Sequence, residues 1–556
     1  MGAQDQPAEI GLRVGAGLVA VEPVGAQQGS FDEPADDVVA DVMRHLPAQG
    51  PRAELARASV RHRGGPPGAL GTELRARAEA DDDPPPALGV RDREALEIPP
   101  RLAHFEQRRE RSAGLVVRNP PPSNTPTTIV SASVSRGLAV VASTSTAAHV
   151  TSIATAEPAT CLEPAMPTTV ILSAARTPIG KLGGGLASLD ATELGATAIR
   201  AALERAEVAP DQVQQVVMGQ VIQAGQGQIP SRQAQTKAGI PREVPSETVN
   251  KVCASGLRGA ALLDVAIRAG DLELGVGGGM ESMSNAPYLL RQERFGFRMG
   301  DGKAIDAMVN DGLTNPFSGK HMAQEASEVA AELELTRPDM DRWALRSHEL
   351  AIAATDEGRL PEEIVAVTVP GRKGDTVVEI DEGPRRETSL EQLSKLPPIF
   401  VENGSHTAGN SPGVNDAGGA LVLASDEWAK RNGRPALARI VAQAQVADDF
   451  AYLARTPAKA ALSALAKAGL KADEIDLWEI NEAFASVTLN SIRVLGIDED
   501  RVNVNGGAIA LGHPIGASGA RILGTLVYEL RRRGGGLGCA AICSGGGQGD
   551  AVIIKV

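Results

Sequence analysis

Short apolar runs alternate with longer amphipathic stretches from Thr168 onward, a pattern typical of buried strands joined by helices. In the first half of this region the pattern predicts strands at 170–173, 213–218, 249–253 and 272–276, and helices at 191–205 and 254–268. In the second half it predicts strands at 476–480, 539–543 and 551–556, and helices at 481–495 and 515–533. Strands that alternate with helices favour a mainly parallel sheet, whose functional residues gather at the carboxyl ends of its strands.

The two halves share an internal repeat. The segment ASGLR at 254–258 opens one predicted helix, and ASGAR at 517–521 lies at the start of another. Each helix is followed by an apolar strand and then by three glycines, at 277–279 and at 545–547. This shared order of helix, strand and glycine run predicts a duplicated α/β unit.

The region between the halves, at about 285–411, is less regular and richer in charge. It contains a predicted amphipathic helix at 337–357 and a polar segment at 371–386. Because this length exceeds that of an ordinary loop, we expect an inserted subdomain that covers a substrate.

Residues 1–165 differ in composition from the rest of the chain. They contain no Lys, Trp or Tyr, half of the chain's 36 Pro, and only two Phe, Phe31 and Phe105. Since such a segment lacks the bulky apolar side chains that offset ordering entropy, we expect little stable structure there. Met166, with PTTVILSAARTP after it, is typical of the start of a globular domain. We therefore expect either a disordered extension or a start codon assigned upstream of the real one.

Charge and cysteine usage exclude several classes of protein. The net charge of -14 and the shortness of the basic runs, at 108–111 and 531–533, disfavour nucleic-acid binding. Four cysteines in so long a chain do not form a disulfide framework, and no CxxC pair indicates zinc, so we expect a reducing, cytoplasmic setting and no metal. The sequence contains no run of eighteen apolar residues, so we expect no membrane span. Its N-terminus has no basic segment followed by an apolar one, so we expect no secretory signal.

Cys253 is the first candidate for chemistry, because it lies in VNKVCASGLRG at a predicted junction of strand and helix. Unpaired N–H groups at a helix N-terminus favour a thiolate and would lower the pKa of this thiol. A lone cysteine is, however, more often a buried apolar residue of the core.

Three further segments carry groups that could act with a thiol. His513 lies in the loop GGAIALGHPIGASGAR and could serve as a general base, although a capping or core role is equally consistent. Cys543 ends an apolar strand before a glycine run that could present N–H groups to an oxyanion, although it could also be a buried strand residue. Asn481 and Glu482 follow a predicted strand and could direct polar groups into a site or cap a helix.

Together these segments resemble the thiolase family over about 166–556. The resemblance rests on VNKVCASGLRG, NEAFA, GHPIGASGAR and CSGGG in that order, and on ARTPIGKLGGGLA, GGGMESMSNAP and TAGNSPGVNDAGGA. It implies a duplicated α/β/α/β/α layered fold with an inserted loop domain. The corresponding division is an extension at 1–165, an N-terminal thiolase domain at 166–284 and 412–435, a CoA-binding loop domain at 285–411, and a C-terminal thiolase domain at 436–556.

The resemblance also implies a role for each candidate. Cys253 would carry the acyl group as a thioester, and His513 would activate it. Cys543 would move the proton at the α-carbon of a second acetyl-CoA, while Asn481, through a water, and His513 would bind the enolate oxygen. The N–H groups of Cys253 and Gly545 would form a second oxyanion hole. The implied reaction is a ping-pong condensation of two acetyl-CoA to acetoacetyl-CoA and CoA, in either direction.

Substrate contacts are implied as well, at His321, Met322, Ser411 and Phe484, although Phe484 could equally be a core residue. Pro412 stands where many relatives carry a Ser that touches the pantetheine of CoA, and His406 is interpreted as a surface residue. The family resemblance implies CoA thioesters as the substrates, no other cofactor, and a homodimer or homotetramer. A broader 3-ketoacyl-CoA thiolase, a β-ketoacyl synthase-like enzyme and an inactive lipid-binding relative are the alternatives, and the CSGGG segment argues against the synthase.

Overall fold

The computed structural model describes residues 10–14, 17–21 and 167–556. Strands β1 (Ile10–Val14) and β2 (Gly17–Val21) form an antiparallel pair. This pair lies within the segment for which little stable structure is expected, and its two strands satisfy each other's backbone hydrogen bonds. The other residues of 1–165 lie outside the described residues, so the expectation of an upstream start codon stays a prediction.

The main unit is built on one ten-stranded sheet with the order β14-β15-β16-β13-β3-β12-β7-β5-β6, to which β4 adds beside β12. The first half comprises β3 (Thr169–Arg176), β4 (Gly180–Lys181), β5 (Gln215–Gly219), β6 (Ser246–Val249), β7 (Leu274–Ser282) and β12 (Asn415–Ser425). The second half comprises β13 (Ala438–Ala447), β14 (Leu477–Ile480), β15 (Leu537–Ser544) and β16 (Gln548–Lys555).

The strand order confirms the predicted duplication. Strands β3 and β13 pair with each other where the halves meet. Outward from this junction the first half runs β3-β12-β7-β5 and the second runs β13-β16-β15-β14. These four strands therefore lie in the same order in each half, and β6 adds at the outer edge of the first half.

The prediction of a mainly parallel sheet is wrong. Only the outer pairs β5–β6, β5–β7 and β14–β15 are parallel, whereas every pair from β15 to β7 across the centre is antiparallel. The reason is clearest at β15 and β16, which are joined by only three glycines, Gly545 to Gly547. Such a connection forces an antiparallel hairpin, because parallel neighbours need a long crossover.

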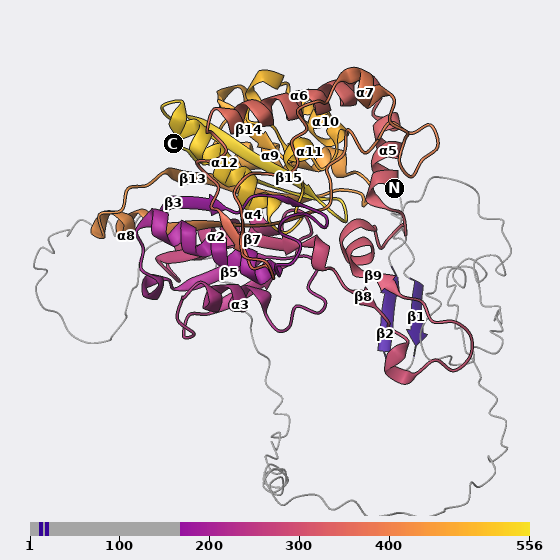
Figure 1. The fold of residues 1–556 in the computed structure, drawn as a ribbon, viewed down its shortest axis with the longest axis horizontal. Coiled ribbons are helices and arrows are strands. Elements are labelled where there is room, and N and C mark those ends of the chain that lie inside the picture. Colours follow the sequence, from indigo (N-terminus) through magenta and orange to yellow (C-terminus); the bar gives the residue numbers. More distant parts are fainter. Residues whose placement is uncertain (1–9, 15–16, 22–166) are drawn as a thin grey trace, which may run out of the picture. The chain divides into compact units, whose positions relative to one another are not determined.

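Helices form three layers around the two halves of the sheet (Figure 1). Helices α2 (Ala191–Ala206) and α3 (Pro230–Lys237) cover the outer face of the first half, and α9 (Thr456–Ala468) and α10 (Ala485–Leu495) cover that of the second. Helices α4 (Ser255–Ala269) and α12 (Ser518–Arg532) pack against each other between the halves. Their buried leucines, including Leu257 and Leu523, form the central apolar core with both sheet halves. The layering α/β/α/β/α is as predicted.

Two helices begin later than their apolar pattern predicts. Helix α10 begins at Ala485 and not at 481, because the backbone N–H of Asn481 still pairs with the carbonyl of Ala541 on β15. Helix α12 begins at Ser518 and not at 515, since Gly516 is held at the junction of the halves by the Glu281 carboxylate. In both places a tertiary contact replaces the first turn of a helix.

The residues between β7 and β12 add two small sheets and three helices beside the main sheet. These elements are β8 (Tyr288–Leu289), β9 (Ile305–Asp306), α5 (Met322–Glu332), α6 (Arg337–Asp356), β10 (Val367–Val369), β11 (Thr376–Val378) and α7 (Leu390–Ser394). Helix α6 confirms the helix predicted at 337–357 and packs on α10 and on α11 (Ala508–Leu511), while α8 (Asp426–Arg431) follows β12. The domain limits at 285 and 411 stay predictions. Within the part of the chain that the structure describes, no helix has both the length and the apolar character needed to cross a bilayer.

Candidate active site

Cys253 lies in a tight turn between β6 and α4 and is almost fully buried. The preceding residue, Val252, has a φ of +43°, a left-handed conformation that is costly for a β-branched side chain. Ser255 holds the turn, because its hydroxyl donates to the Val252 carbonyl at 2.6 Å and accepts from the Lys251 N–H at 2.8 Å. The backbone therefore bends sharply to place the sulfur at the first turn of α4.

Lys251 ties this turn to the other half of the protein. Its ammonium pairs with the carboxylate of Asp550 on β16 and donates to Gln445 at 2.8 Å, and both members of the ion pair are nearly buried. The carbonyl of Lys251 accepts a hydrogen bond from the Ser544 hydroxyl at the end of β15. The nucleophile's turn is thus fixed to the strands that carry Cys543 and the glycine run.

The N–H groups of Cys253 itself and of Gly545 lower the pKa of the Cys253 thiol, although burial outweighs them. A side chain at position 545 would not fit, since a Cβ there would lie 2.6 Å from Met322 Cε and 3.2 Å from the Val252 methyl groups. Glycine permits the close approach of β15–β16 to the sulfur. Gly545 therefore lies beside the turn of the nucleophile, and the predicted oxyanion hole stays a prediction.

The expected lowering of the Cys253 pKa is wrong. Burial raises the pKa of this thiol to about 12, which outweighs the hydrogen bonds from Cys253 and Gly545, and the nearby Glu281 carboxylate acts in the same direction. Removal from water penalises the thiolate more than the helix N-terminus stabilises it. Cys253 is thus a neutral thiol at pH 7, and its reaction requires a base.

His513 has the tautomer that such a base requires. Ser518 donates its single hydroxyl proton to the Pro514 carbonyl at 3.0 Å, so its oxygen accepts from His513 Nδ1 at 2.6 Å. This assigns the imidazole proton to Nδ1 and leaves the lone pair on Nε2. Burial, with a smaller contribution from the Arg521 charge, lowers the pKa of His513 to about 3, so the ring is neutral. The Asn415 amide oxygen fixes the backbone by accepting from the His513 N–H at 2.9 Å.

Asn481 joins His513 to the second half of the site. Its side-chain nitrogen lies 3.5 Å from His513 Nε2, and its backbone N–H donates to Ala541, two residues before Cys543. The side-chain oxygen is buried and has no hydrogen-bond partner among the described residues. A buried acceptor of this kind suits the predicted role of holding a water on a substrate oxygen.

Cys543 lies next to last in β15 and is buried. Burial, together with the nearby Cys253, raises the pKa of its thiol well above the usual range. A thiol of this kind is a strong base once its proton has been removed, as abstraction of a weakly acidic α-proton requires. Cys253, Cys539 and Cys543 are all free thiols.

Glu482 does not point into the site, although the sequence left that role open. The carboxylate is fully buried and accepts hydrogen bonds from Trp343, Ser347, Asn503 and the backbone of Ile509, at 2.8 to 3.0 Å. Trp343 and Ser347 belong to α6, and Ile509 belongs to α11, just before His513. Glu482 therefore fixes the loop of the base to the inserted region.

Glu281 links the two halves on the other side of His513. It lies on β7 and accepts from the backbone N–H groups of Val221 at 3.0 Å, Ile222 at 3.2 Å and Gly516 at 2.9 Å. Burial raises the pKa of Glu281 to about 7 against the lowering effect of these donors. Its side chain was not singled out by sequence reasoning, although it lies in the quoted segment GGGMESMSNAP.

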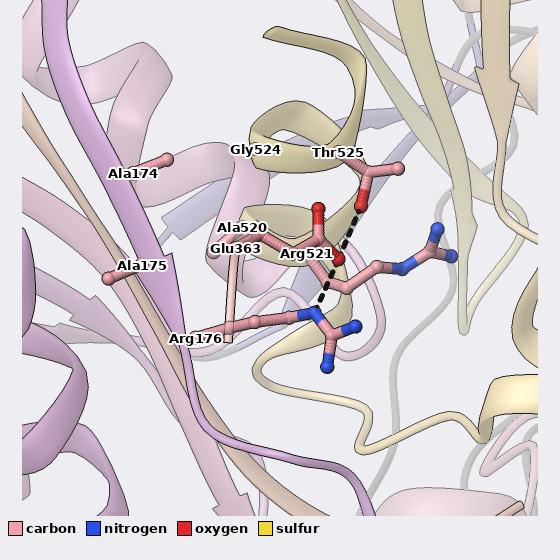
Figure 2. Close-up of a pocket in the computed structure, with 8 residues that line it drawn as sticks. All are labelled: Ala174, Ala175, Arg176, Glu363, Ala520, Arg521, Gly524 and Thr525. Atoms are coloured by element: carbon pink, nitrogen blue, oxygen red, sulfur yellow. Dashed lines mark hydrogen bonds and ion pairs between the residues drawn. The ribbon is translucent and has the colours of Figure 1, made fainter. Parts of the chain in front are cut away.

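Behind the site, charged side chains are buried between β3 and α12 around a cavity of about 10 Å³ (Figure 2). Arg176 donates to Glu363 at 2.6 Å and to Asp381, and Thr525 on α12 donates to the same Glu363 carboxylate. Arg521, also on α12, pairs with Glu479 at 2.8 Å, two residues before Asn481. These ion pairs brace the helix that follows His513.

The four predicted substrate contacts differ in their surroundings. Met322 and Phe484 share one apolar cluster with Cys543, and His321 caps α5 by accepting from the Ala323 N–H while its ring stacks on Phe400 at 4.0 Å. Ser411 is buried, and its hydroxyl has no partner within residues 167–556. His406 is not a surface residue as expected, because it is fully buried, lies 3.0 Å from the Ser486 hydroxyl and packs near the Phe484 ring.

A cavity of about 570 Å³ opens beside the nucleophile. Val252, Met322 and Gly545 form the wall next to Cys253, and Phe317 and Phe450 form another part of the lining. This volume lies in the usual range for small-molecule sites. Among the described residues, no group of three or more His, Cys, Asp or Glu is arranged to hold a metal ion.

Comparisons with known proteins identify relatives of this chain. The family model described as thiolase, N-terminal domain matches residues 169–427, and that described as thiolase, C-terminal domain matches residues 434–556. The chain is 48% identical over 387 residues to the acetyl-CoA acetyltransferase of Cupriavidus necator, covering 69% of this chain and 98% of that protein. It is also 48% identical over 386 residues to the protein of the same name from Pseudomonas aeruginosa, with 69% and 98% covered. The crystal structure of the Bacillus anthracis acetyl-CoA acetyltransferase matches with a TM-score of 0.69 and 39% identity, over 70% of this chain and 99% of that one. This protein therefore belongs to the thiolase family.

Proposed function

We propose that this thiolase is an acetyl-CoA C-acetyltransferase, which joins two acetyl-CoA molecules to acetoacetyl-CoA and free CoA or catalyses the reverse cleavage. The observation that carries the proposal is that the turn of Cys253 is bound to Ser544 and packs against Gly545, directly after the buried Cys543. The printed names of the relatives from Cupriavidus necator and Pseudomonas aeruginosa support acetyl-CoA as the substrate.

In the first half-reaction, the Cys253 sulfur attacks the thioester carbonyl while its proton passes to His513 Nε2. The carbonyl oxygen becomes an oxyanion, which the N–H groups of Cys253 and Gly545 stabilise. The bond to the CoA sulfur then breaks, and the departing thiolate takes a proton from Cys543. The products are an acetyl thioester on Cys253, a thiolate at Cys543 and free CoA.

In the second half-reaction, the Cys543 thiolate removes the α-proton of a second acetyl-CoA. The enolate oxygen is held by His513, now protonated, and by a water on Asn481. The carbanion attacks the acetyl group on Cys253, the carbon–sulfur bond breaks, and Cys253 regains its proton from His513. Cys253, His513 and Cys543 thereby return to their starting protonation states, and the α-proton of the second acetyl-CoA replaces the proton that Cys543 gave to CoA.

The remaining features of the proposal concern the setting of the enzyme. It uses CoA thioesters as substrates and needs no other cofactor. Because two free thiols must stay reduced for turnover, a reducing, cytoplasmic compartment suits it. We further propose a homodimer or homotetramer, on the basis of the family resemblance.

Acyl-enzyme formation tests the proposal directly. Wild-type protein incubated with radiolabelled acetyl-CoA should retain one labelled thioester per chain, and acetoacetyl-CoA should be cleaved when CoA is added. Cys253→Ala should abolish both signals. Cys539→Ala is the matched control, since it removes another buried thiol from the same strand as Cys543 and should retain labelling. Labelling that persists in Cys253→Ala would contradict the assignment of the nucleophile.

A further inference from the structure

Two phenylalanines in the lining of the 570 Å³ cavity form an aromatic pair. The rings of Phe317 and Phe450 stack with their centroids 3.7 Å apart and their planes at 11° to each other. Their side chains come from segments far apart in the sequence and remain 63% and 49% exposed. Because the two stacked rings lie together in the lining of this cavity, they form an apolar surface that a bound ligand can contact.

The pair lies next to the oxyanion donors. A Cβ built on Gly546 would be 3.7 Å from the Phe317 ring, and Gly546 directly follows Gly545. An acyl group whose carbonyl oxygen is held by the Gly545 N–H therefore has its first carbons close to this ring. The chain of contacts runs from the Cys253 sulfur through Gly545 and Gly546 to the aromatic pair.

Both rings are held in fixed positions relative to the nucleophile. The loop of Phe317 is closed by the Asn315 side chain, which accepts from the Phe317 N–H at 3.1 Å and donates to the buried Glu325 carboxylate at 2.9 Å. The loop of Phe450 is tied to the glycine run, because the Asp448 N–H donates to the Gly547 carbonyl at 2.7 Å. The loops that present the two rings are thus held in place by hydrogen bonds to Asn315 and to the glycine run.

The charge of the cavity indicates which part of a CoA thioester it accepts. Its lining includes the carboxylates of Asp311 and Asp448 and no Lys or Arg. The phosphates of CoA are anionic and are repelled by such a surface, whereas a short uncharged acyl chain is not. The acyl end of the substrate therefore fits the side of the cavity that the phenylalanines close.

We propose that the Phe317–Phe450 pair is the wall that limits the length of the acyl chain on Cys253, an inference that rests on the proposed thiolase reaction. Cleavage of acetoacetyl-CoA leaves an acetyl group on Cys253, whereas cleavage of 3-ketooctanoyl-CoA leaves a hexanoyl group. The longer chain must pass the stacked rings or displace one of them. The pair thus selects short-chain substrates.

The test compares kcat/KM for thiolysis of 3-ketooctanoyl-CoA and acetoacetyl-CoA in wild-type protein, Phe317→Ala and Phe450→Ala. The kcat/KM for 3-ketooctanoyl-CoA divided by that for acetoacetyl-CoA should rise about tenfold or more in each variant. Pockets discriminate against each excluded methylene by roughly tenfold or more. The double variant should raise this ratio by less than the product of the two single increases, because loss of either ring already opens the stack. Phe295→Ala removes a ring that is 91% exposed and does not line the cavity, so it should leave the ratio unchanged.

An unchanged ratio in both cavity variants overturns the inference, and so does a wild-type enzyme that already prefers 3-ketooctanoyl-CoA. If wild-type protein does not cleave acetoacetyl-CoA at all, the proposed function fails instead. In that event the ratio between 3-ketooctanoyl-CoA and 3-ketohexanoyl-CoA in the same variants decides whether the pair limits chain length. Because both rings are largely exposed, neither substitution should change the melting temperature by more than a few degrees.

Discussion

Replacing Ser518 with alanine should slow acylation of Cys253 by removing the group that sets the tautomer of His513. The Ser518 oxygen accepts the Nδ1 proton at 2.6 Å in a buried setting, and its own proton is used by the Pro514 carbonyl. In Ser518→Ala the Nδ1–H group loses this acceptor. The ring can then move the proton to Nε2, where it blocks the lone pair that must accept the Cys253 proton.

The size of the effect follows from the cost of an unpaired buried donor. Leaving one N–H group without a partner costs about 1–3 kcal/mol. If the productive tautomer must be regained against that cost, the acylation rate should fall about 5- to 150-fold. The apparent affinity for acetyl-CoA should change little, because Ser518 is buried behind the ring and does not line the substrate cavity.

Rapid-quench measurement of acyl-enzyme formation with radiolabelled acetyl-CoA reports this rate separately from KM. Ser486→Ala is the matched control, since Ser486 also hydrogen-bonds a buried histidine, His406, at 3.0 Å. Both variants should lose similar stability, but only Ser518→Ala should acylate slowly, and Ser518→Thr, which keeps the hydroxyl, should recover most of the rate. Equal rates in wild type and Ser518→Ala, or an equal loss in the control, would refute the tautomer assignment.

Two further predictions concern Cys543 and Glu281. Cys543→Ala should still become acylated at Cys253 but should lose exchange of the acetyl-CoA α-protons with deuterated solvent, as followed by mass spectrometry; retained exchange would remove Cys543 from proton transfer. Glu281 has its pKa raised from 4.5 to about 7 on folding, so its folded state holds a proton that the unfolded state has released between these values. Its contribution to stability is therefore present below pH 4.5 and is lost as the pH rises through about 7, by up to about 3 kcal/mol. Relative to wild type, Glu281→Gln should thus become more stable as the pH is raised from about 5 to about 8; a difference in melting temperature that stays constant over this range would contradict the shift.

Sequence reasoning failed mainly where one buried group depends on another. Ser518 lies inside the segment GHPIGASGAR that singled out His513, and a serine at the first position of a helix four residues after Pro514 was the available signal. Its function depends on the direction of one hydroxyl, which no local pattern specifies. His406 was similarly misplaced at the surface, since only the packing of Phe484 and Ser486 around it decides its burial.

The apolar alternation, the repeated ASG helix starts and the glycine runs were enough to establish a duplicated α/β protein. The four reactive segments were also recognisable, because reactivity requires particular residue types at particular junctions. The direction of the central strands could not be recognised from the sequence, because it depends on where distant segments meet. Strand β3 lies between β12 and β13, whose residues come more than two hundred positions later.

The sequence by itself determined which residues are available for chemistry, because a nucleophile, a base and glycine donors have local signatures. Only the tertiary structure decided how these residues behave. Burial made Cys253 a neutral thiol with a raised pKa in place of the expected thiolate, and the Ser518 contact selected the basic nitrogen of His513. Desolvation and hydrogen-bond direction arise from neighbours that the chain brings together on folding, so they cannot be read along the sequence.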